Sequence, residues 1–143
     1  TATGNGSYLW SNAMTTASIT VTPVTTTTYT VTVTGSNGCT NTASALVTVT
    51  PLPVSGLDGP VEVCMDEYGV FSASPVVSGA TYTWTFDGGT SFDGDANDPT
   101  ESVKWAPSYA NTTRTVTLVV TKDNCTSTYT KAVLVKQGAY LNT

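Results

Sequence analysis

The sequence reads TTYTVTVT at residues 27–34, and this alternation of threonine with apolar residues decides the fold class. Apolar side chains at every second position predict a half-buried β-strand, because successive side chains of a strand point to opposite faces. No segment has the spacing of an amphipathic helix, so the chain is predicted to be all-β. The same period of two recurs around Ile19 and Val21, Val47 and Val49, Tyr82 and Trp84, Val116 to Val120, and Val133 and Val135.

A short pattern occurs twice in the chain and predicts two modules. Tyr8-Leu9-Trp10 is followed by a Thr/Val strand and then by Asn37-Gly38-Cys39-Thr40. Tyr82-Thr83-Trp84 is followed by another such strand and then by Asn124-Cys125-Thr126. Short strands separated by turn residues are typical of sandwiches, so we expect two tandem antiparallel β-sandwiches.

The two copies also predict where the modules begin and end. Cys64 precedes Trp84 by 20 residues, whereas the same distance before Trp10 passes the start of the sequence. We therefore expect the first module, residues 1–50, to lack its N-terminal strand. A Pro/Gly linker is expected at residues 51–59, the second module at 60–137 and an exit linker at 138–143.

Three cysteines carry the most specific local prediction. Cys64 and Cys125 are expected to form a disulfide in the second module, where a loop of roughly 60 residues would gain about 4 kcal/mol on the chain-entropy model. The alternative is two buried thiols. Cys39 is expected to be unpaired in residues 1–143, with its partner in the segment that supplies the first strand. The chain has no histidine and no Cys-x-x-Cys spacing, which disfavours zinc.

The three tryptophans have two interpretations. Trp10 and Trp84 hold the same place in the Tyr-x-Trp pattern, and Trp105 follows Val103 at strand spacing. We favour core positions for all three. The alternative is an aromatic platform on which sugars stack.

An acidic segment is the candidate metal site. Asp93, Asp95 and Asp98 could supply three carboxylate oxygens to calcium, which prefers hard oxygen ligands from a flexible loop. The alternative is a solvated turn, because Asp, Gly and Asn are common turn residues. No other cofactor is expected.

Composition excludes several function classes. The formal net charge is −5 with only five basic residues, so a phosphate-binding patch for nucleic acid is not expected. No apolar run approaches the roughly 20 residues of a membrane span. With no histidine the most frequent general base is absent, so we expect no enzyme activity.

As a set, these motifs resemble the repeats of secreted Bacteroidota surface proteins. Residues 7–11, 15–21, 27–34 and 37–40 resemble their immunoglobulin-like repeats. Residues 63–64, 80–84, 102–105 and 116–121 resemble their PKD-like modules. The resemblance implies immunoglobulin-like (PKD-like) sandwiches in long exported adhesins or gliding-associated proteins, many of which use type IX secretion.

The expected function is a structural and adhesive repeat of an extracellular cell-surface protein or filament. Its partners would be neighbouring modules and, in some settings, surface glycans or proteins. Two alternatives stay open. One is a carbohydrate-binding accessory module of a secreted enzyme, and the other is a fibre subunit whose first module is completed by a strand from a neighbouring chain.

Overall fold

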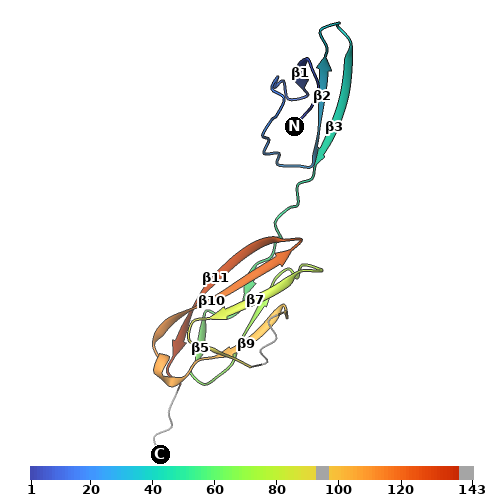
Figure 1. Ribbon diagram of the computed structural model, residues 1–143. Helices are drawn as coiled ribbons and strands as arrows, with labels where there is room; N and C mark the ends of the chain where they lie inside the picture. The colour runs from blue at the N-terminus through green and yellow to red at the C-terminus, as the bar shows by residue number, and fades with distance from the viewer. Residues whose placement is uncertain (93–96, 139–143) are drawn as a thin grey trace, which may run out of the picture. The chain divides into compact units, whose positions relative to one another are not determined.

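The computed structural model describes residues 1–92 and 97–138. The chain divides into two compact units, Thr1–Thr50 and Pro51–Thr143. Both units are built from β-strands (Figure 1), and the single 3-10 turn of the described residues, η1, spans Pro107–Tyr109. The all-β prediction is confirmed.

The first unit is one antiparallel sheet. Its strands are β1 (Ser7–Trp10), β2 (Thr27–Thr34) and β3 (Thr40–Val47), in the order β1-β2-β3. The hairpin between β2 and β3 turns at Gly38, whose φ of 79° lies in the left-handed region that glycine tolerates best. Trp10 and Val31 are opposite each other in the ladder and are the buried residues of this sheet.

The prediction of a sandwich in residues 1–50 is wrong, because this unit has a single layer. The alternating residues around Ile19 and Val21 form no strand, and residues 11–26 run as turns and irregular chain. Pro23 follows this short apolar run and cannot donate a ladder hydrogen bond, which limits its extension as a strand. The first unit therefore differs from the expected sandwich by a whole second sheet and not by one strand.

The second unit contains two four-stranded sheets. The first has the order β5-β11-β10-β7, formed by β5 (Glu62–Cys64), β11 (Cys125–Lys136), β10 (Thr112–Lys122) and β7 (Thr81–Phe86). The second has the order β4-β6-β9-β8, formed by β4 (Leu57–Asp58), β6 (Gly69–Ala73), β9 (Thr100–Lys104) and β8 (Thr90–Ser91). All pairings are antiparallel except that of β5 with β11.

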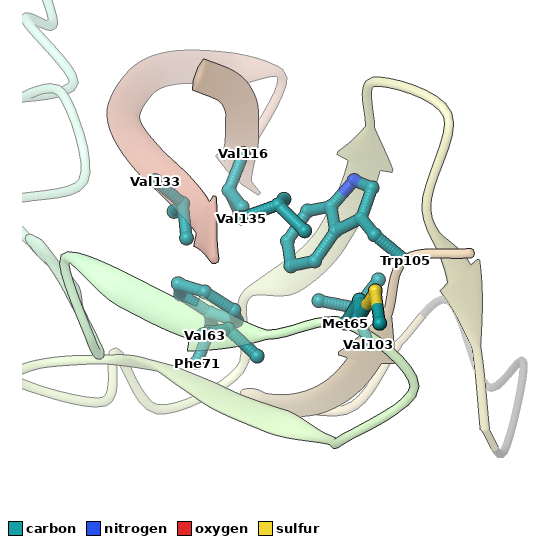
Figure 2. Packing of buried hydrophobic residues seen from close by; sticks show 8 residues of the cluster. All are labelled: Val63, Met65, Phe71, Val103, Trp105, Val116, Val133 and Val135. Atoms are coloured by element: carbon teal, nitrogen blue, oxygen red, sulfur yellow. The ribbon is translucent and has the colours of Figure 1, made fainter. Parts of the chain in front are cut away.

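Side chains from both sheets meet in one core (Figure 2). Val116, Val133 and Val135 come from the first sheet, and Phe71 and Val103 come from the second. The alternation predicted for β10 is confirmed, since Val116, Leu118 and Val120 are all fully buried on one face. The indole of Trp105 lies between the two layers, near Val135 and Met65, and Val63 belongs to the same core cluster.

The strand order identifies the second unit as an immunoglobulin-like sandwich. The order β4-β6-β9-β8 corresponds to strands A, B, E and D of that fold, and β11-β10-β7 corresponds to G, F and C. The short β5 adds to strand G in parallel, so the chain crosses from one sheet to the other between β4 and β5. Assignment to the PKD type stays a prediction.

The expected linker at residues 51–59 is partly folded. Leu57 and Asp58 form β4 and pair with Ala73 and Ser72, so the second unit begins before residue 60. Just upstream, the hydroxyl of Tyr129 accepts the backbone N–H of Ser55 at 3.1 Å. Most of the expected exit linker, residues 139–143, lies outside the described residues.

The disulfide predicted between Cys64 and Cys125 is wrong. Cys64 is opposite Lys136 at one end of β11, while Cys125 begins that strand at its other end. Eleven residues of strand separate these two positions, about 36 Å at ~3.3 Å per residue. A disulfide requires Cα atoms about 6 Å apart, so the two thiols cannot meet in this fold. The expected upstream partner of Cys39 was inferred from that pair and loses its basis.

Candidate functional site

The inner face of the first unit carries a groove of about 540 Å³. Its floor is the apolar face of β2 and β3, with Val31, Val33 and Ala43, and residues 1–5 form one wall. Trp10 lies in the groove and is anchored there by its indole N–H, which donates to the carbonyl of Thr16 at 2.8 Å. A smaller hollow of about 120 Å³ adjoins the same tryptophan and includes Ile19 and Val21.

The two units are best compared through their tryptophans. Trp10 is opposite Val31 in the first unit, and Trp84 is opposite Leu118 in the second. By this register β1-β2-β3 corresponds to β7-β10-β11, the first sheet of the sandwich without β5. The second unit covers this face with its other sheet, whereas in the first unit Ala43 and Ala45 stay exposed.

Strand β3 forms a long open edge of the first unit. The backbone N–H of Ser11 donates to the carbonyl of Thr30, so the peptide groups of Thr30 point toward β1. Ser44 is opposite Thr30, and its own N–H and C=O therefore point away from β2. By the period of two, the peptide groups of Thr40, Thr42 and Leu46 point the same way.

The first unit has no charged side chain. Residues 1–57 contain no Asp, Glu, Lys or Arg, and the first charged residue of the chain is Asp58. The sequence interpretation treated charge as a property of the whole chain and missed this division. Counting charges separately for each expected module would have revealed it.

A second exposed feature lies at one end of the β4-β6-β9-β8 sheet. The rings of Tyr68 and Phe92 pack edge to face with centroids 5.1 Å apart, and these residues are 46% and 71% exposed. The ammonium of Lys104 lies 5.4 Å from the centroid of the Tyr68 ring. Neither aromatic residue was singled out from the sequence, because neither belongs to the repeated pattern.

The three tryptophans differ in burial. Trp105 is fully buried and Trp10 is buried, while Trp84 is half-buried. The indole N–H of Trp84 donates to the backbone carbonyl of Asp98 at 2.9 Å, and its ring stacks on Phe86. Each indole N–H donates to a backbone carbonyl, which ties all three side chains to the fold.

The calcium candidates are only partly within the described residues. Asp93 and Asp95 lie outside them. Asp98 is exposed, and its backbone carbonyl is the acceptor for Trp84. Among residues 1–92 and 97–138, no three His, Cys, Asp or Glu side chains group as metal ligands would. Calcium binding stays a prediction.

One buried carboxylate lies near this segment. Glu101 on β9 is 2% exposed, and its Oε2 accepts the hydroxyl of Ser91 on β8 at 2.7 Å. A buried carboxylate needs hydrogen bonds, and this one holds the short strand β8 against β9.

Comparison with known proteins leaves the chain without an assigned family. No protein-family profile matches it, and no curated protein does. Among solved structures, the crystal structure of murine CEACAM1b aligns over 94% of this chain and 86% of that chain, with 12% identity and a TM-score of 0.45. A likeness at this level does not identify a family. None of the helical structure in the described residues is long and apolar enough to cross a bilayer.

Proposed function

We propose that the chain is a structural and adhesive segment of an extracellular protein or filament, without catalytic activity. Its role is to hold neighbouring parts of the protein apart and to resist tension along the chain. The resemblance to secreted surface repeats supports the location. The partners are neighbouring modules of the same kind.

The observation that carries this proposal is the parallel pairing of β5 with β11. The chain enters the second unit near Tyr129, beside the β10–β11 hairpin, and leaves it after Lys136 at the opposite end of β11. Tension on the two ends therefore pulls β5 and the end of β11 in opposite directions along their common axis. All the hydrogen bonds between them are loaded together, in shear.

Two of the flanking bonds define this clamp. The N–H of Leu134 donates to the carbonyl of Val61, and the N–H of Met65 donates to the carbonyl of Lys136, each at 2.9 Å. Val63 lies between them, opposite Val135, and its side chain is buried in the core. A bond pattern that breaks only as a unit gives slow unfolding under force, and forced unfolding depends on the unfolding rate.

Single-molecule pulling on the full chain tests this proposal. Val63→Pro deletes a ladder N–H, whereas Val63→Ala deletes more side-chain volume but keeps that N–H. If β5–β11 is the clamp, Val63→Pro lowers the unfolding force of the second unit well below that of Val63→Ala. Equal forces for the two variants would contradict the proposal.

The exposed aromatic pair favours carbohydrate binding as a second candidate function. Tyr68 and Phe92 present apolar ring surface beside Lys104, a combination suited to sugar stacking and hydrogen bonding. The test is a glycan array probed with the full chain and with Phe92→Ala, using Val76→Ala as an exposed control. Signal that is lost in Phe92→Ala but kept in the control supports this function, and no signal from the wild type excludes the glycans on the array.

A further inference from the structure

We propose that strand β3 pairs with β3 of a second copy of this chain, which joins two three-stranded sheets into one. The edge offers the peptide groups of Thr40, Thr42, Ser44 and Leu46, which point away from β2. Unpaired peptide groups along an exposed strand are a template for pairing with another strand. The proposal goes beyond the structural function above and does not depend on it.

The sequence of β3 suits antiparallel pairing with itself. A two-fold axis at Ala43 places Thr42 opposite Ser44 of the copy and Thr40 opposite Leu46 of the copy. These are the four residues with outward peptide groups, so each pair exchanges two hydrogen bonds. Ala43 then meets its own counterpart in a non-hydrogen-bonded pair, where side chains are closest and a methyl group fits.

One existing interaction competes with this pairing. The side-chain Oδ1 of Asn41 accepts the outward N–H of Thr42 at 2.9 Å. Pairing replaces that bond with one to the carbonyl of Ser44 in the copy. Asn41 lies at an exposed position, so its side-chain amide returns to water and keeps its hydrogen bonds.

The absence of charge favours a second copy as the partner. With no charged side chain in residues 1–57, two first units approach without electrostatic repulsion. Like charges directly opposite each other destabilise strand pairs, and β3 has none. It also lacks proline, the other residue that blocks edge pairing.

Several sheet edges of the second unit carry features that hinder strand pairing, which β3 lacks. Its long edge strand β11 carries Lys131 and Lys136, and β5 pairs with the end of that strand. Strands β4 and β8, at the edges of the other sheet, are two residues long each. Short edge strands and lysines are known protections against edge pairing. Among the described edge strands that lack both protections, β3 has eight residues and β7, at the other edge of the first sheet of the second unit, has six.

The pairing also enlarges the groove. In this register the two inner faces lie on the same side of the joined sheet, because Ala43 and its counterpart occupy one face. Ala45 of one copy then lies opposite Asn41 of the other, and the two grooves beside Trp10 meet across the new strand pair. The apolar strip therefore becomes continuous between the copies.

Sedimentation velocity of the full chain over a concentration series, with reductant present, tests the proposal. We expect a reversible dimer of the 14.8 kDa chain. The double variant Thr42→Lys/Ser44→Lys places two pairs of lysines opposite each other and should weaken the dimer at least about tenfold. The matched control is Thr32→Lys, on the same wet face but on the central strand β2.

The outcomes are distinct. A dimer that persists in Thr32→Lys and dissociates in the double variant supports pairing through β3. A wild-type chain that stays monomeric at the highest concentration, or a double variant that dimerises like the wild type, overturns it. Far-UV circular dichroism of each variant, and the melting of the second unit, establish that both units remain folded during the comparison.

Discussion

Replacement of Trp105 should reveal how much of the second unit's stability depends on its largest core side chain. The indole is fully buried, it meets Phe71 edge to face at 6.4 Å between centroids, and its N–H donates to the carbonyl of Asp87 at 2.9 Å. Truncating a buried tryptophan to alanine costs about 3–5 kcal/mol. The lost hydrogen bond adds about 1 kcal/mol, so we expect Trp105→Ala to lower the free energy of unfolding by about 5 kcal/mol in total.

Trp105→Phe divides this total between packing and hydrogen bonding. Phenylalanine keeps the edge-to-face contact with Phe71 but loses the bond to Asp87 and leaves part of the indole volume empty. We expect a cost of about 2–3 kcal/mol, which lowers the melting temperature of a unit of this size by roughly 10–20 °C.

Urea unfolding of the full chain, followed by circular dichroism, measures these free energies. Trp84→Phe serves as the control, because Trp84 is half-buried and stacks on Phe86. We expect that control to cost about 1 kcal/mol. If Trp105→Ala costs no more than Trp84→Phe, then Trp105 is not the centre of the core and the reasoning fails.

Three further predictions address single features of the second unit. If the chain is unfolded without reductant and alkylated, both Cys64 and Cys125 should take up the label, which intact mass measures. If these two cysteines stay unlabelled, as they would in a disulfide, the strand register is refuted. Gly59→Ala should lower the free energy of unfolding by at least about 2 kcal/mol, because the φ of Gly59 is 148° and an added Cβ would lie 2.4 Å from a ring carbon of Phe71. An unchanged thermal melting curve would contradict this contact. Tyr82→Phe should cost about 1–2 kcal/mol in urea unfolding, because its hydroxyl accepts and donates hydrogen bonds with the backbone of the preceding loop; a neutral result would mean that the loop does not depend on them.

The strands of the second unit could largely be predicted from the sequence. The alternation around Val116 and Val133 reflects a real inner face, because one side of each strand is packed against another sheet. The same period failed at Ile19 and Val21. A short alternating run becomes a strand only where a neighbouring strand pairs with it, and residues 1–50 contain none that does so.

The cysteine pairing could not be predicted from spacing alone. Two cysteines that flank a repeated pattern suggest a bridge, but spacing contains no information on strand direction. Because β5 runs parallel to β11 and pairs with its last residues, Cys64 is brought to the end of the strand farthest from Cys125. A parallel addition to the last strand is a long-range contact that only the folded topology determines.

The exposed surfaces were the least predictable part. The groove beside Trp10 exists because no second sheet covers this face of the first unit. No residue type or sequence pattern predicts that a face of a sheet stays uncovered. Tyr68 and Phe92 lie outside every repeated motif and meet only because β6 and β8 flank β9. The charge-free stretch, in contrast, was visible in the sequence.

The lack of charged side chains before Asp58 has a consequence for how the chain responds to acid. Acid unfolds proteins mainly by protonating carboxylates that are stabilised in the folded state, and the first unit has no carboxylate side chain. Its free energy of unfolding should therefore be almost the same at pH 3 as at pH 7. All ten acidic residues of the chain belong to the segment from Asp58 onward. Any effect of acid on carboxylate side chains is thus confined to the second unit, which contains all of them.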